Sequence, residues 1–228
     1  MNTSRKQASR AAKWAAIQAC RLVGAQQTAD IFYVRRLEGY LSTPKVRLLY
    51  RVVSELSGPG QIAEIGSWKG KSTVALSLAA KRAGRGETVY AIDHHRGVAE
   101  DTGLGTWTPQ GSTWSTFLSV IAEAGVDDVV KPLRMTSLAG ARWLKRQGVQ
   151  LKFLLVDGAH DEESVTKDLD AFFPLVVPGG LIALDDAKPD GYCPGVYRAY
   201  QRVIEDRTQP IEWAGTLFLV KKRATHPI

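Results

Sequence analysis

The stretch Phe153-Leu154-Leu155-Val156-Asp157-Gly158-Ala159-His160 is an apolar run that ends abruptly at a carboxylate, and Gly179-Gly180-Leu181-Ile182-Ala183-Leu184-Asp185-Asp186 repeats the pattern. Such runs are typical of strands that are buried on both faces, as in a parallel sheet covered by helices. Ligands of open α/β folds bind at the carboxyl ends of these strands. The two stretches therefore predict a parallel sheet with a ligand site beside their acidic ends.

Strand and helix patterns alternate along the chain around these two stretches. Expected strands cover 61–65, 88–92, 129–133, 153–156 and 181–184, and expected helices cover 36–56, 72–82, 114–124, 137–146, 162–173 and 196–206. Residues 212–221 form a last strand or an antiparallel pair, and 94–113 and 187–194 are long loops. Strict alternation predicts an α/β fold with a doubly wound, mostly parallel sheet.

The composition predicts one α/β domain in a reducing compartment. The 228 residues are 44% hydrophobic, which is enough for a substantial core. Cys20 and Cys193 form neither a disulfide framework nor a metal-ligand spacing, so we expect a cytoplasmic protein. No segment approaches the roughly 20 consecutive apolar residues of a membrane-spanning helix.

The net charge of +7 is concentrated in the N-terminal part of the chain. Residues 1–60 contain ten Lys and Arg against three Asp and Glu, whereas residues 61–228 contain twenty of each. We therefore predict a basic N-terminal helical extension over 1–60 and a neutral domain over 61–228. The neutral domain argues against a nucleic-acid partner. Residues 1–30 have no acid before Asp30, so weak contact with an anionic surface is a candidate role, and a homo-oligomer is compatible with the sequence.

The segment Glu64-Ile65-Gly66-Ser67-Trp68-Lys69-Gly70-Lys71-Ser72-Thr73 follows the first expected strand and opens a helix. A dinucleotide would need the pattern G-x-G-x-x-G, which is missing here. A phosphate-binding P-loop needs four residues between its glycines, whereas this segment has three, and Glu64 would repel phosphate. A P-loop-like NTPase is therefore the weaker alternative.

S-adenosylmethionine suits the same turn better, because it carries a sulfonium and an ammonium group instead of phosphate. Gly66 allows the backbone to approach a ligand closely. Asp93 follows the second expected strand, where an acid can accept hydrogen bonds from ribose hydroxyls. The turn and Asp93 together predict binding of S-adenosylmethionine.

The acidic ends of the two opening stretches predict a metal site. If their strands are neighbours, the ends lie about 5 Å apart, so Asp157, Asp185 and Asp186 crowd one place. Carboxylates this close repel each other unless a cation lies between them. His160 lies beside them as a candidate general base, while Asp161 is the candidate N-cap of the following helix.

Residues 38–221 resemble class I S-adenosylmethionine-dependent O-methyltransferases of the macrocin O-methyltransferase type, a group that includes cephalosporin-hydroxylase-like proteins. The matching stretches are 64–73, 89–93, 156–160, and 178–180 continuing into Asp185-Asp186. The resemblance implies a seven-stranded Rossmann-like sheet, Mg²⁺ or another divalent cation on Asp157, Asp185 and Asp186, and a base at His160. The chain departs from many relatives at Glu162, where they carry an aromatic residue.

The resemblance implies an S-adenosylmethionine-dependent, Mg²⁺-dependent O-methyltransferase that acts on a hydroxyl of a sugar or of a natural-product or polysaccharide precursor. A non-catalytic S-adenosylmethionine-binding subunit is a further alternative. The expected catalytic residues are His160 and Asp157. The expected cofactor-binding residues are Glu64, Gly66, Ser67, Gly70, Ser72, Thr73, Asp93, Ser137 and Asp157.

Overall fold

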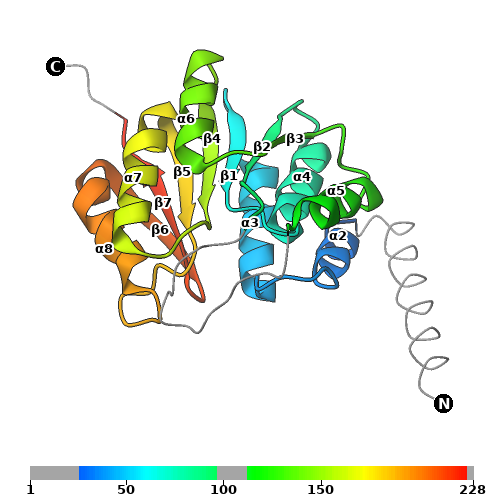
Figure 1. Ribbon diagram of the computed structural model, residues 1–228, viewed down its shortest axis with the longest axis horizontal. Coiled ribbons are helices and arrows are strands. Elements are labelled where there is room, and N and C mark those ends of the chain that lie inside the picture. Colours follow the sequence, from blue (N-terminus) through cyan, green and yellow to red (C-terminus); the bar gives the residue numbers. More distant parts are fainter. Residues whose placement is uncertain (1–25, 97–111, 225–228) are drawn as a thin grey trace.

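The computed structural model describes residues 26–96 and 112–224, which form a seven-stranded sheet between two layers of helices (Figure 1). The strands lie in the order β3-β2-β1-β4-β5-β7-β6. Strands β1 to β5 are parallel, β7 runs antiparallel to β5, and β6 pairs antiparallel with β7. Their bounds are β1 Gln61–Ile65, β2 Val89–Ile92, β3 Val130–Leu133, β4 Leu151–Val156, β5 Val176–Leu184, β6 Thr208–Ala214 and β7 Leu217–Lys222. The predicted doubly wound, mostly parallel sheet is confirmed, and the chain ends in the antiparallel pair.

Helices cover both faces of the sheet. Their bounds are α2 Gln26–Val34, α3 Thr43–Glu55, α4 Lys71–Ala83, α5 Trp114–Glu123, α6 Ser137–Arg146, α7 Glu162–Phe172 and α8 Pro194–Val203, with short 3₁₀ turns at Phe173–Leu175 and Glu205–Arg207. Buried residues of α3, α4 and α5 form one hydrophobic cluster, and those of α6, α7 and α8 form the other. In Figure 1, α7 and α8 lie beside β5 and β7, whereas α2, α4 and α5 lie near the β3 edge.

Strand β4 shows why these residues form a central strand. All six of its residues are buried, and successive side chains point to opposite faces of the sheet. Leu154 and Val156 join the cluster under α6 to α8, while Phe153 and Leu155 join the cluster under α3 to α5. A strand with both faces covered in this way needs the continuous apolar run that the sequence displays.

The strand register places the predicted site residues in one row. Ile65 pairs with Ile92 on one side and with Val156 on the other, and Val156 pairs with Leu184. The next residues of these four strands are Gly66, Asp93, Asp157 and Asp185. The ladder continues past the strand ends, because the Asp157 amide donates to Ile65 O at 2.9 Å and the Asp185 amide donates to Val156 O at 2.9 Å.

Several expected boundaries were wrong. The helix predicted over 36–56 begins only at Thr43, because the chain turns before it at Gly39, where φ is +148°, and Pro44 favours a helix start. Strand β5 begins at Val176 rather than at 181, because Val176 pairs with Leu151 and the pairing then resumes at Leu181 after a register shift that includes Gly179 and Gly180. Helix α8 ends at Val203, three residues before the expected end.

Helices α2 and α3 pack directly on the domain. The Tyr50 hydroxyl donates a hydrogen bond to Asp30 Oδ2 at 2.6 Å, and Arg82 forms an ion pair with the same oxygen at 2.8 Å, so one buried cluster joins α2, α3 and α4. The basic arm before residue 26 lies outside the described residues, and the division at residue 60 stays a prediction. Within residues 26–96 and 112–224, none of the helices has the length and apolar character needed to cross a membrane.

Candidate active site

A cavity of about 690 Å³ lies at the carboxyl ends of the parallel strands. It is centred where β1 and β4 meet, the point at which the strand order reverses direction from β2 and β3 to β5. Ligands of doubly wound sheets bind at this switch point. The volume is within the usual range for small-molecule sites, about 300–1,000 Å³.

The turn after β1 requires glycine at its first position. Gly66 has φ of +86°, and a Cβ atom at this residue would lie 2.0 Å from the carbonyl oxygen of Asp157. Only glycine allows the first turn to pass so close to the end of β4. Gly70, with φ of +92°, then reverses the chain into α4.

Asp93 holds this turn in place. Its Oδ2 atom accepts hydrogen bonds from the backbone amides of Ser67 at 3.1 Å and Trp68 at 2.8 Å. Its Oδ1 atom accepts one from the His95 amide at 2.6 Å. A carboxylate has about four acceptor positions, so Asp93 keeps capacity for a ligand hydroxyl while it fixes the turn.

Most of the predicted cofactor-binding residues line the cavity. These are Gly66, Ser67, Ser72, Asp93, Ser137 and Asp157. The Ser67 hydroxyl is notable, because the side chain is buried at 2% exposure and has no hydrogen-bond partner among the described residues. A buried hydroxyl without a partner is costly, and a ligand in the cavity would supply one.

Glu64, Gly70 and Thr73 are not part of the cavity wall. Glu64 is fully buried beneath the turn, where its Oε2 atom accepts a hydrogen bond from the Thr73 hydroxyl. Burial raises the pKa of Glu64 to about 8, so the carboxyl is largely protonated at neutral pH. Glu64 and Thr73 are therefore placed to support the turn from below.

The structure brings His160 and the predicted carboxylates together. His160 Nε2 lies 3.7 Å from Asp157 Oδ1 and 3.8 Å from Asp186 Oδ2. Burial lowers the pKa of His160, but Asp157, Asp186 and Asp185 outweigh it and raise the pKa above the ordinary value for histidine. Asp161 caps α7 as predicted, because its Oδ1 atom accepts a hydrogen bond from the Ser164 amide at 2.8 Å. His160 is thus free of the capping role.

Lys45 is the principal site residue that the sequence analysis missed. It comes from the first turn of α3, is only 8% exposed and lines the cavity. Its Nζ atom lies 2.6 Å from Asp185 Oδ1 and 3.2 Å from Asp186 Oδ1. The Thr216 hydroxyl also donates to Asp186 Oδ1, at 2.6 Å. Two of the three predicted metal ligands are therefore already bound by groups of the chain itself.

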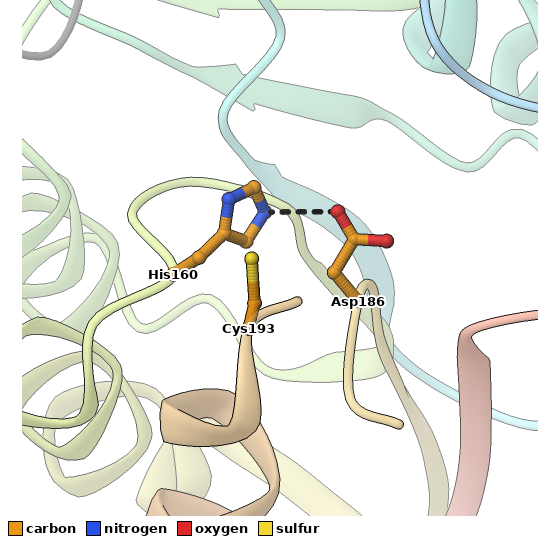
Figure 2. Close-up of side chains that lie close together, drawn as sticks. All are labelled: His160, Asp186 and Cys193. Atoms are coloured by element: carbon orange, nitrogen blue, oxygen red, sulfur yellow. Dashed lines mark ion pairs between the residues drawn. The ribbon is translucent and has the colours of Figure 1, made fainter. Parts of the chain in front are cut away.

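The predicted metal set of Asp157, Asp185 and Asp186 stays a prediction. Among the described residues, the potential ligand atoms that do converge belong to His160, Asp186 and Cys193, which lie within 4.8 Å of one another. Figure 2 shows these three side chains, with the ion pair between His160 and Asp186 dashed. Magnesium prefers oxygen ligands, so a histidine, a thiol and one carboxylate suit it poorly.

Aromatic side chains lie at one side of the cavity. Tyr40 and Trp68 both line it, with ring centroids 5.6 Å apart, and Tyr40 is 75% exposed. His94 also lines the cavity, whereas His95 is buried and packs against Trp114 and Phe117. No sequence motif marks Tyr40, which lies in the turn that precedes α3.

The chain is similar to known proteins in sequence and in structure. Residues 63–187 match a family described as a methyltransferase domain. The crystal structure of CalS11, a calicheamicin methyltransferase, is similar at a TM-score of 0.62, with 17% identity over 77% of this chain and 76% of that one. TomG from Streptomyces achromogenes, an O-methyltransferase of tomaymycin synthesis in complex with S-adenosylmethionine, is similar at a TM-score of 0.59, with 20% identity over 81% of this chain and 82% of that one.

An O-methyltransferase from Bacillus cereus in complex with S-adenosylhomocysteine is similar at a TM-score of 0.60, with 17% identity over 92% of this chain and 91% of that one. At these identities the solved structures establish the Rossmann-like fold, while the family match covers more than half of the chain. The chain belongs to the methyltransferase family, and its fold is that of the class I enzymes.

Proposed function

We propose that the protein transfers a methyl group from S-adenosylmethionine to a hydroxyl group of a small molecule. The observation that carries this proposal is a single cavity that contains both the turn held by Asp93 and the basic side chain of His160. A donor bound on the turn and an acceptor bound near His160 would share one space. Such positioning accounts for a large part of the acceleration of a two-substrate reaction.

The turn fits S-adenosylmethionine on the evidence of its own atoms. The backbone at Gly66 approaches the end of β4 too closely for any side chain, and Gly66 also lines the cavity. The Ser67 hydroxyl has no hydrogen-bond partner within residues 26–96 and 112–224, and Asp93 keeps acceptor capacity for ribose hydroxyls. The relatives TomG and the Bacillus cereus enzyme were solved with S-adenosylmethionine and S-adenosylhomocysteine. When bound, this cofactor supplies an activated methyl group on a sulfonium centre.

His160 is the proposed base. Its neutral ring accepts the proton of the acceptor hydroxyl at Nε2 as the oxygen becomes the nucleophile. The ring then carries a positive charge, which Asp157 and Asp186 stabilise from distances of 3.7 and 3.8 Å. Asp157 therefore has a role even without direct contact with the acceptor.

The acceptor class proposed here is a sugar or an aromatic natural product. The exposed Tyr40 ring and the neighbouring Trp68, tilted by 39° to each other, offer aromatic faces on which such a molecule can stack. Two of the similar proteins, CalS11 and TomG, are named for small natural products. The predicted cytoplasmic location and the predicted divalent ion stay predictions, and no step of this proposal depends on the ion.

The test is binding followed by turnover. Isothermal titration with S-adenosylmethionine and S-adenosylhomocysteine should each give one site per chain, and ATP should give none. Incubation with S-adenosylmethionine carrying a labelled methyl group and a panel of sugar and phenol acceptors should then yield labelled ethers. Binding of ATP in place of S-adenosylmethionine would favour the NTPase alternative, and binding without transfer to any hydroxyl would favour the non-catalytic subunit.

A further inference from the structure

Lys45 occupies the position between carboxylates at which the sequence predicts a metal ion. Its ammonium contacts Asp185 Oδ1 at 2.6 Å and Asp186 Oδ1 at 3.2 Å. Lys45 and Asp185 are 8% and 5% exposed, so the pair is screened weakly by water. Lysine and aspartate are almost never buried to this extent unless they are paired.

The ammonium and a divalent ion cannot share these oxygens. Magnesium binds carboxylate oxygens at about 2.0–2.1 Å, which would place it within a few ångströms of the Lys45 nitrogen. Two cations at that distance in a partly buried site repel strongly. Magnesium could therefore bind Asp185 Oδ1 and Asp186 Oδ1 only if Lys45 first moved away and left the cavity wall.

The surroundings of Lys45 oppose such a movement. Thr216, in the turn between β6 and β7, donates to the Asp186 oxygen that Lys45 also contacts. The neighbouring residues of α3, Val46, Leu48 and Leu49, are buried in the hydrophobic cluster with α4, so the helix that carries Lys45 is fixed. Both the carboxylate and the helix that carries the lysine are therefore held in place.

We propose that Lys45 is the resident cation of this active site, which neutralises Asp185 and Asp186 in place of Mg²⁺ and excludes that ion from the Oδ1 atoms that the lysine contacts. The inference deepens the proposed function, on which it rests for the identity of the site. The Lys45 side chain would take the place of an exchangeable metal ion. Asp157 is left outside the Lys45 contacts, available to the imidazolium form of His160.

Metal binding tests this inference independently of catalysis. Mn²⁺, a paramagnetic substitute for Mg²⁺, is titrated into the full-length protein and followed by electron paramagnetic resonance. The wild-type protein should bind Mn²⁺ weakly, whereas Lys45→Met should bind it about tenfold or more tightly, because the competing charge is gone. Lys45→Arg should keep the weak binding. Lys81→Met removes an exposed lysine that pairs with Asp128 and is the matched control, with no change expected.

The wild-type protein alone can overturn the inference. If it binds one Mn²⁺ per chain tightly, and Asp185→Asn removes that binding, then the metal displaces Lys45 and the inference is wrong, even if Lys45→Met fails to fold. Equal affinity for Mn²⁺ in the wild-type protein and a folded Lys45→Met variant would also show that the inference is wrong. S-adenosylmethionine affinity is measured on the same samples without metal, so a failure of the proposed function, seen as loss of cofactor binding, is distinguished from a failure of the inference.

Discussion

The Asp93 carboxylate accepts a hydrogen bond from the backbone amide of Trp68 at 2.8 Å, which ties the end of β2 to the turn after β1. The same oxygen accepts from Ser67, so the acid both shapes the turn and faces the cavity. This double role explains why an acid at the end of the second strand and a glycine turn after the first belong together in the site.

Replacement of Asp93 should weaken cofactor binding. We expect Asp93→Ala to reduce the affinity for S-adenosylmethionine by about 1–3 kcal/mol, because ligand hydroxyls and turn amides lose a charged acceptor. Isothermal titration measures the change, and Asp128→Ala, which removes an exposed acid far from the cavity, should leave the affinity unaltered. Undiminished affinity in an Asp93→Ala variant whose circular dichroism is normal would refute the cofactor assignment.

His160→Ala should lower kcat by roughly 10²–10⁴-fold with little effect on cofactor affinity, since only proton transfer is lost. His160→Asn should be equally inactive but stable, because Asp161 and not His160 caps α7. The wild-type rate should fall as the pH drops, since protonated imidazole cannot accept a proton. The raised pKa of His160 places this fall at a higher pH than for an unperturbed histidine. Wild-type turnover by His160→Asn at neutral pH would leave the base unassigned.

The sequence predicts the row of site residues well because strand ends carry a local signal. Each apolar run stops at an acid or a glycine, and parallel register then aligns Gly66, Asp93, Asp157 and Asp185 without further information. The contacts of Lys45 carry no such signal. Residue 45 meets residue 186 across 141 positions of sequence, through a side chain on a helix outside the sheet. The position of Lys45 beside the carboxylates therefore depends on the packing of α3, which the local sequence does not show.

Strand β5 gives a second example of what the sequence leaves open. Its first half contains Gly179 and Gly180. Because glycine is depleted in strands, the predicted strand begins only at 181. In the fold, a Cβ atom on Gly180 would lie 2.9 Å from Val177 O and 3.2 Å from Lys152 O. Close approach of the backbone leaves little space for a side chain at this position, which a local pattern does not reveal.

Glu64 should make the stability of the protein fall as the pH rises from about 4.5 to about 8. Its pKa is about 8 in the folded protein and near 4.5 when unperturbed. A carboxyl group with a raised folded pKa contributes stability that is complete below the unfolded value and is lost as the pH rises through about 8. Each unit of the shift corresponds to about 1.4 kcal/mol, so the effect is of order a few kcal/mol.

Glu64→Gln should abolish this dependence, because the amide stays neutral and has nearly the same shape. Urea unfolding at pH 5 and pH 9 measures the free energy of unfolding of both proteins. The variant should gain stability relative to the wild-type protein at pH 9, and the gain should vanish at pH 5. Glu55→Gln, on the exposed side of α3, is the control for loss of a surface charge. A difference between Glu64→Gln and the wild-type protein that is the same at both pH values would disprove the buried, protonated state of Glu64.

Zinc should inhibit the enzyme through the three side chains of Figure 2. The ligand atoms of His160, Asp186 and Cys193 lie within 4.8 Å of one another, and zinc accepts nitrogen, oxygen and sulfur in a tetrahedral arrangement. Burial raises the pKa of the Cys193 thiol, but a coordinating metal deprotonates it. Binding would occupy Nε2 of the proposed base, so turnover should fall with added Zn²⁺ and return when the ion is chelated.

Cys193→Ser should raise the inhibitory concentration of Zn²⁺ about tenfold or more, because a hydroxyl is a much poorer zinc ligand than a thiolate. Cys20→Ser removes the other cysteine of the chain and should keep the wild-type sensitivity. Equal inhibition of Cys193→Ser and the wild-type protein would show that zinc acts elsewhere, whereas relief in Cys20→Ser would move the effect to the N-terminal segment.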